Sequence, residues 1–273
     1  MIDLHVHSAP CLLPRLADDV QTVEWYERAG FAGCVLKSHW ESTVGRAAAA
    51  GAGRTIRVHG GLVLNHAAGG LSPAAVDAAL RLGARVIWMP TVDARGHAEA
   101  RLPRPEGAPG GATLAVPPRE PGAACCVHEI LKLVAEADVV LATGHLSAVE
   151  VGWLVRAARD AGVRRMLVTH ATFLVPALGA AELRELVELG ASVEITAYQL
   201  LHQVGCDAAQ LAMVASALRP DRVVLSSDAG QPDSPPGPEA LLTLLDALER
   251  EGVDRAALEA MASENPAQLL AAS

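Results

Sequence analysis

Two histidines two residues apart, His5 and His7, lie near the start of the sequence in the segment IDLHVH. If this segment is a strand, alternate side chains point to one face, so both imidazoles project together with Asp3. Two imidazoles at this spacing can coordinate one metal ion. The carboxylate of Asp3 can support one of these ligands by accepting a hydrogen bond from it. Accidental alternation in a strand is the competing interpretation, so the rest of the chain must decide.

Further residues of metal-ligand type follow other short apolar runs of the sequence. Each alone has a simpler explanation, since a lone histidine at a strand end is usually hydrogen-bonded or on the surface. Their recurrence at five of eight runs favours a shared site for one or two ions of the Zn, Mn, Fe or Ni type. The candidate ligands are His5, His7, His145, His170 and Asp228, with Lys37 and His39 at the end of the second run.

Eight apolar runs rich in Val, Ile, Leu and Ala must position these residues. Helical patterns separate the runs, as in SPAAVDAALRLG, where Ser72 is the expected N-cap and Gly83 the expected stop. This alternation is typical of βα units and a parallel sheet. Eight units predict a single (β/α)8 barrel over residues 1–273 rather than a doubly wound sheet. The runs are 2–7, 32–37, 56–65, 84–90, 138–144, 165–170, 191–197 and 222–228.

Residues 93–122 interrupt the alternation with six prolines, five glycines and no periodic pattern. The segment is predicted to be a long loop after the fourth strand, over the C-terminal rim where barrel active sites are built, and to act as a lid. A disordered insertion without a role is the alternative. Its arginines could meet an anionic substrate or simply be solvated; they are Arg95, Arg101, Arg104 and Arg119.

Composition narrows the class of partner. The net charge is −9 with no basic stripe, which argues against nucleic acid and anionic membranes and favours a small-molecule substrate. No apolar run reaches the length of about 20 residues that spans a bilayer, and no secretory signal is recognised, so a cytoplasmic protein is expected. Five cysteines without a C-x-x-C pair predict neither a disulfide framework nor a zinc ribbon. A homo-oligomer is left open.

Taken together, these residues resemble the amidohydrolase superfamily of metal-dependent hydrolases along nearly the whole chain. Its members are (β/α)8 barrels with H-x-H after the first strand, a histidine after the fifth, another after the sixth and an aspartate after the eighth. The segment SENPAQLL is also similar to a helix start near that family's C-terminus. The resemblance implies that one or two ions, most simply Zn, activate a water molecule, and that Asp228 moves its proton. The matching residues are His5, His7, His145, His170 and Asp228.

The sequence departs from this family at the fourth run. Members with two metals usually have a bridging carboxylated lysine or glutamate there, whereas VIWMPTVD offers only Asp93 nearby. Lys37 is the natural substitute, because it ends the neighbouring strand and shares a strand face with His39. Arginine cannot be carboxylated, and Lys37 and Lys132 are the only lysines among 22 basic residues. An unmodified Lys37 that binds a substrate carboxylate is the alternative.

A second resemblance covers the start of the chain. DLHVHS and GFAGCVLKSHWES are similar to the first two motifs of the PHP phosphoesterases, in which an Asp-His pair follows the H-x-H. Ser38 stands where that aspartate would, HGGLVLNH lacks the usual glutamate, and PHP barrels have seven strands. This resemblance therefore ranks second, and His39 stays a candidate ligand or substrate contact.

Three more residues are candidate substrate contacts: His66 after the third run, Glu194 in the seventh, and Tyr198 just beyond it. For Glu194 a structural pairing with an arginine is the alternative, while His97 is assigned to the long loop. The sequence as a whole predicts a metal-dependent hydrolase of an amide, cyclic amide or lactone bond in a small molecule. The alternatives are a PHP-like phosphoesterase, a metal-dependent decarboxylase or isomerase, and a metal-binding barrel without catalysis.

Overall fold

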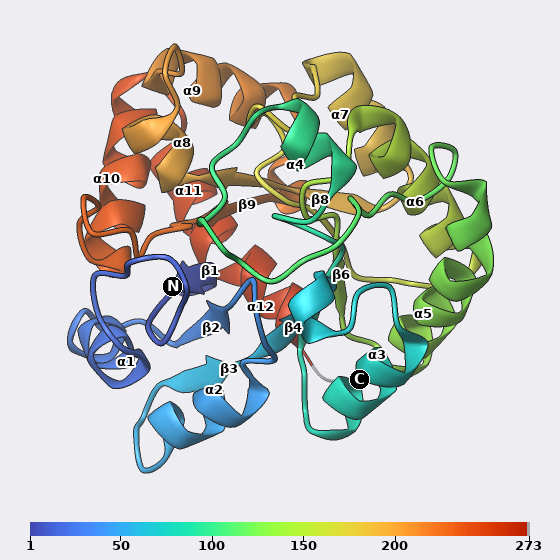
Figure 1. Ribbon diagram of the computed structural model, residues 1–273. Coiled ribbons are helices and arrows are strands. Elements are labelled where there is room, and N and C mark those ends of the chain that lie inside the picture. Colours follow the sequence, from blue (N-terminus) through green and yellow to red (C-terminus); the bar gives the residue numbers. More distant parts are fainter. Residues whose placement is uncertain (272–273) are drawn as a thin grey trace.

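The computed structural model describes residues 1–271 and shows a ring of parallel strands surrounded by helices (Figure 1). The (β/α)8 barrel predicted from the sequence is confirmed. β3 and β4 together occupy one position in the ring, so the barrel has eight strand positions, whereas the PHP fold has seven strands. Consecutive strands pair in chain order, except that β3 and β4 do not pair with each other. The strands are β1 (Ile2–His7), β2 (Gly33–Lys37), β3 (Arg57–His59), β4 (Gly61–Val63), β5 (Val86–Trp88), β6 (Val140–Ala142), β7 (Met166–Val168), β8 (Ala191–Thr196) and β9 (Val223–Ser226).

The third run of the sequence forms two short strands instead of one. β3 pairs with β2, whereas β4 pairs with β5, and Gly60 lies between them. Thr43 links β2 to β4 at this break, because its hydroxyl donates to Leu36 O at 2.7 Å and accepts from Gly61 N at 2.9 Å. A Cβ at Gly60 would lie 2.5 Å from Thr43 O, so only glycine fits beside this connection.

The barrel closes where β1 meets the residues that follow β9. Asp228 N donates to His5 O and His7 N donates to Ala229 O, each at 2.8 Å. The carboxylate of Asp3 accepts from Ser227 N at 3.1 Å and adds a side-chain link. These bonds set the two histidines of β1 directly beside Asp228.

A bulge in β1 changes the face on which Asp3 lies. Asp3 pairs with Cys34 and His7 pairs with Lys37, so β1 has one residue more than β2 between these two pairs. Asp3 therefore turns outward and accepts a hydrogen bond from Tyr26, while His7 faces the barrel interior. The expected common face of Asp3, His5 and His7 is wrong, because strict alternation fails at the bulge.

The helices cover the outside of the strands, and α12 lies across the end of the barrel opposite the site (Figure 1). Leu4, Val63, Val86 and Trp88 fill the interior, with Leu269 and Leu270 of α12 beneath them. The helices are α1 (Asp19–Arg28), α2 (Val44–Gly51), α3 (Pro73–Arg81), α4 (Arg95–Glu99), α5 (Ala124–Ala137), α6 (Ala148–Asp160), α7 (Ala180–Glu188), α8 (Ala197–His202), α9 (Ala208–Ala217), α10 (Gly237–Arg250), α11 (Arg255–Ala262) and α12 (Glu264–Leu270).

The long segment after β5 crosses the mouth of the barrel (Figure 1). It contains the short helix α4, and a bridge between Ala94 and Leu114 closes it into a compact loop. Arg104 pairs with Asp93 and Arg119 pairs with Glu99, so these two arginines hold the loop together. No helix within residues 1–271 is both long and apolar enough to cross a membrane.

Candidate metal centre

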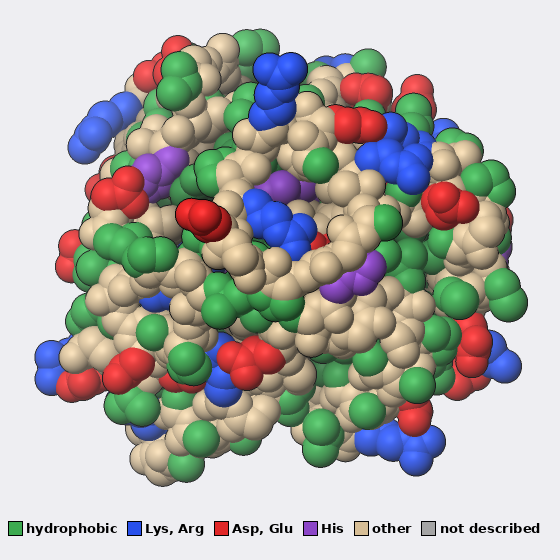
Figure 2. Space-filling model, viewed as in Figure 1, with side chains coloured by type: hydrophobic (Ala, Val, Ile, Leu, Met, Phe, Trp, Pro, Cys, Tyr) green, Lys and Arg blue, Asp and Glu red, His purple; other side chains and the backbone are tan. Residues whose placement is uncertain are grey.

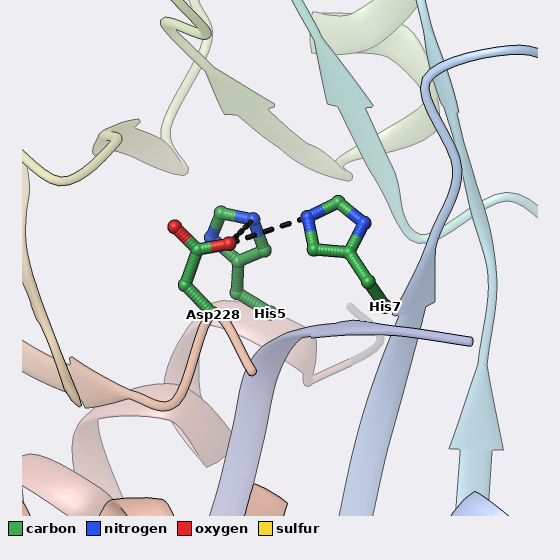
Figure 3. A group of neighbouring side chains, drawn as sticks. All are labelled: His5, His7 and Asp228. Atoms are coloured by element: carbon green, nitrogen blue, oxygen red, sulfur yellow. Dashed lines mark ion pairs between the residues drawn. The ribbon is translucent and has the colours of Figure 1, made fainter. Parts of the chain in front are cut away.

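Three predicted ligands meet at the carboxyl end of the barrel. Potential ligand atoms of His5, His7 and Asp228 all lie within 4.8 Å of one another, and all three residues are buried (Figure 3). Asp228 Oδ1 is 3.0 Å from His5 Nε2 and 3.2 Å from His7 Nε2. Two imidazoles and one carboxylate suit an ion of the Zn, Mn, Fe or Ni type.

The backbone around Asp228 is shaped to bring its carboxylate to the histidines. Asp228 itself has a φ of 49°, a left-handed conformation that costs energy for a residue with a Cβ. Gly230 has a φ of 119°, and a Cβ there would lie 2.0 Å from His7 O. The turn after β9 therefore packs directly against β1, which only glycine at position 230 permits.

Hydrogen bonds behind the rings fix which nitrogen faces the centre. His7 Nδ1 lies 3.1 Å from Lys37 O, and because a carbonyl only accepts, Nδ1 carries the proton and neutral His7 keeps its lone pair on Nε2. Burial would raise the pKa of Asp228, but the charge and the hydrogen bond of His5 hold it well below its usual range. The centre thus presents an ionised carboxylate and an imidazole nitrogen ready to coordinate.

Glu194 of β8 lies behind the ligands and not at the cavity surface. Its Oε2 is 3.3 Å from His5 Nδ1 and accepts a hydrogen bond from His170 N at 2.9 Å. Burial lowers the pKa of His5, but the carboxylates of Asp228 and Glu194 outweigh this and raise it to about 9. We expected Asp3 to support one of the candidate ligands from behind, but Glu194 occupies that position behind His5. Glu194 is also absent from the cavity lining, where its predicted role as a substrate contact would require it.

Lys37 reaches the same centre from β2. Its Nζ lies 2.8 Å from His5 Nε2, and its side chain is buried over the ring of Trp88. Burial lowers the pKa of Lys37 to about 8, with Asp228 and Glu194 partly opposing the shift. Lys132 differs in burial and in partner, since it is exposed on α5 and, within residues 1–271, forms an ion pair with Glu136 alone. The two lysines of the sequence therefore have unrelated environments.

His170 and His145 form the other side of the site. Their ring centroids are 4.9 Å apart, and the ring of His170 is 6.2 Å from that of His5. His170 follows β7 with a φ of 28°, and its buried Nδ1 has no hydrogen-bond partner among the described residues. The structure brings both rings to the cavity but leaves them outside the compact group of His5, His7 and Asp228.

His97 of α4 is a member of the site that the sequence did not reveal. Its Nε2 lies 3.2 Å from Pro103 O, so in the neutral ring this nitrogen donates and Nδ1 accepts. His145 Nδ1, at 2.8 Å, must then donate to His97 Nδ1, which leaves the lone pair of His145 on Nε2. Burial lowers the pKa of both rings, which favours these neutral forms. In the sequence, the position of His97 in the long loop over the barrel rim was the one feature that could have pointed to this role.

A cavity of about 300 Å³ opens above these residues. Figure 2 shows basic and histidine side chains in the hollow at the centre of this face. His39 and Tyr198 line it as expected, and His39 is oriented by a 2.8 Å contact between its Nδ1 and Thr91 Oγ1. His66 lies elsewhere, with its Nε2 2.7 Å from Ala112 O. The residues around the cavity that were not predicted include Leu13, Arg15, Val92, Leu102, Phe173 and Gln231.

Fold and site together define a (β/α)8 barrel with a candidate metal centre at the carboxyl ends of its strands. The chain belongs to DUF6282, a family of unknown function, whose model matches residues 1–194. No curated protein matches the sequence.

Solved structures share the barrel along almost its whole length. An organophosphorus hydrolase from Deinococcus radiodurans superposes with a TM-score of 0.63 at 15% identity, over 98% of this chain and 92% of that one. An organophosphate-hydrolysing enzyme engineered from a weak promiscuous lactonase gives 0.65 at 14%, over 98% and 95%. An amidohydrolase from Pseudomonas aeruginosa gives 0.61 at 12%, over 98% and 94%. The likeness is one of fold.

Proposed function

We propose that the protein is a metal-dependent hydrolase that cleaves an amide, cyclic amide or lactone bond of a small molecule. The observation that carries the proposal is the convergence of His5, His7 and Asp228 below an open cavity at the carboxyl end of the barrel. Catalytic sites of (β/α)8 enzymes lie at this end. Similar barrels named as an organophosphorus hydrolase, a lactonase template and an amidohydrolase support the choice of reaction.

The residues present fit a divalent ion, and Zn suits the donor set best. His5 Nε2 lies within 3.0 Å of both Lys37 Nζ and Asp228 Oδ1, although one ring nitrogen can serve only one of them in a hydrogen bond. Such crowding of donor atoms at one point is what a cation would relieve. When bound, the ion lowers the pKa of a water molecule toward neutrality and polarises the carbonyl under attack.

Asp228 is the residue that we assign to proton transfer. Both ion pairs, to His5 and to His7, are made by one of its oxygens, Oδ1, while the other oxygen pairs with neither ring (Figure 3). Asp228 also lines the cavity, so the second oxygen can accept a proton from the attacking water and pass it to the leaving group. The hydrogen bond from Asp228 N to His5 O holds this residue in place.

Lys37, His145 and His170 are the residues that we assign to a second ion. The unpartnered Nδ1 of His170 and the lone pair on His145 Nε2 are two nitrogens free to coordinate. A carbamate on Lys37 would add oxygen ligands between the two groups of histidines, because its Nζ already lies beside His5. We therefore propose that Lys37 replaces the bridging residue that is missing after β5.

The first experiment measures metal content and hydrolysis together. Protein purified without chelators is analysed by plasma mass spectrometry and assayed against lactones, amides and p-nitrophenyl phosphates, beside the variant His5→Ala/His7→Ala. A matched control is His128→Ala, because His128 is exposed on α5 and its one hydrogen bond among the described residues is to Ala124 O in the same helix. We expect stoichiometric metal and hydrolysis of lactones or amides in wild type and control, both lost in the double variant. Protein that stays metal-free after reconstitution would contradict the proposal. Activity on p-nitrophenyl phosphates alone would replace the proposed reaction with phosphoester hydrolysis.

A further inference from the structure

Arg15, in the loop between β1 and α1, forms no ion pair with any of the described residues. It lines the same cavity as His7, Lys37 and Asp228. Its Nε and Nη2 are buried, and neither makes a hydrogen bond within residues 1–271. Guanidinium groups cannot relieve burial by losing a proton, since their pKa lies far above neutral. Arg15 as a whole is partly buried, and these two donors are shielded from water without a partner. Shielding the donors of a permanent cation is costly, and such groups normally have an anionic partner.

Other arginines near the rim show how unusual this is. Arg46 pairs with Asp19 and Glu41, and it also donates to Ser8 O. Arg104 pairs with Asp93 in the long loop. Of these three arginines, Arg15 is the one that lines the cavity and forms no ion pair with a described carboxylate, which leaves its donors available to a ligand.

The loop that carries Arg15 is anchored to the metal centre. Leu16 N donates to Gly230 O at 2.9 Å, and Gly230 lies two residues after Asp228. Ala9 N donates to Ala17 O at 2.8 Å, which closes the loop at its base. The backbone that carries Arg15 is therefore held at a fixed place relative to Asp228, which suits a residue that orients a substrate.

We propose that Arg15 binds a carboxylate group of the substrate. The reaction rests on the function proposed above, whereas the carboxylate site rests on Arg15 itself. A guanidinium presents two parallel N–H groups that match the two oxygens of a carboxylate. Arg15 offers one unpaired positive charge, which a single carboxylate balances, so the ligand that we assign is a monoanion. Leu13, Val92 and Phe173 line the remaining wall and fit an apolar body.

Binding of matched probes tests this assignment without requiring catalysis. Phenylacetate and its neutral analogue phenylacetamide are titrated calorimetrically into the purified protein and into Arg15→Met and Arg15→Lys. Arg81→Met is the matched control, because it removes the same charge from an exposed position on α3. Benzylphosphonate is a third probe, which distinguishes a carboxylate from a doubly charged phosphonate. Thermal unfolding of each variant checks that it is folded.

We expect phenylacetate to bind wild type and Arg81→Met equally and to lose at least about tenfold in affinity in Arg15→Met, as for a lost charge-assisted hydrogen-bond pair. Arg15→Lys should fall between them, since it keeps the charge without the paired donors. Phenylacetamide should change less than about twofold in every variant.

Three results would overturn the proposal: no phenylacetate binding to wild type, equal affinity in Arg15→Met, or an equal loss in Arg81→Met. Tighter, Arg15-dependent binding of benzylphosphonate would overturn the assignment of a monoanion. If Arg15-dependent binding is found in a protein that hydrolyses none of the lactones and amides, the hydrolase proposal fails and the carboxylate site stands.

Discussion

The two sides of the site are held by different parts of the molecule. His5, His7 and Asp228 lie where β1 and the end of β9 meet, and two backbone hydrogen bonds of 2.8 Å fix them there. His145, after β6, instead has its ring oriented by His97 from the loop that crosses the barrel mouth. The first side is therefore part of the barrel wall, whereas the second depends on how the rim loop is folded. Substitutions should separate the two sides.

The largest effect is expected on the wall side, at Asp228. Asp228→Asn keeps the size of the side chain but removes the anionic ligand and the proposed proton acceptor. We expect kcat/KM to fall by at least about 10³-fold, which combines loss of acid–base catalysis with weaker metal binding. Steady-state kinetics and metal analysis measure the two parts. Activity within about tenfold of wild type would show that Asp228 is not at the reacting centre.

Lys37→Arg tests the link between the two sides. Arginine keeps the positive charge and cannot form a carbamate. We expect the metal held by His145 and His170 to be lost while metal on His5, His7 and Asp228 is retained. Metal content, with and without bicarbonate during reconstitution, measures this. Unchanged metal content would contradict a carbamate bridge, and Lys132→Arg, on the exposed face of α5, is the matched control.

His97→Ala should affect the loop side alone. Removing the ring leaves His145 Nδ1 without its partner, so the tautomer and orientation of His145 are no longer fixed. Residues that support a ligand in this way are typically worth about 10- to 100-fold in metal affinity or activity. We expect a loss in this range for His97→Ala, with the same readout for His128→Ala unchanged.

Glu194→Gln makes the equivalent test on the wall side. Its Oε2 supports His5 and His170 together, so we expect metal loss from both groups of ligands. Metal loss from only one group of ligands in Glu194→Gln would contradict the division between wall and loop. Metal loss from both groups in His97→Ala would contradict it as well. Competition with a chromophoric chelator measures the affinities.

The smallest effect is expected from Arg104→Ala in the rim loop. This change removes the ion pair to the buried carboxylate of Asp93, but the arginine is partly exposed, so the cost is moderated by solvent. We expect faster amide hydrogen exchange across residues 100–114 and a change in kcat/KM of less than about tenfold. Exchange indistinguishable from wild type would show that the loop is held by other contacts.

Much of this arrangement follows from local sequence patterns. The βα periodicity determined the barrel, and residues of metal-ligand type at the ends of the runs determined which side chains reach its rim, because parallel strands all end at the same face. The persistence of lysine at position 37 marked a residue that the fold buries beside His5. These features depend on residue type and on the spacing of residues that are close together in the sequence, so they can be read without the structure.

Tertiary structure decided how those residues are supported and oriented. The bulge in β1 turned Asp3 outward, Glu194 came to support His5 across 189 residues, and His97 reached His145 across 48. Arg15 became notable only because it forms no ion pair with a carboxylate of the described residues. Register, side-chain direction and the presence of a partner depend on residues far apart in the chain. The sequence by itself determined the barrel and the candidate metal-binding residues. Tertiary packing decided which side chains support those residues, and it left the charge of Arg15 without a protein partner among the described residues.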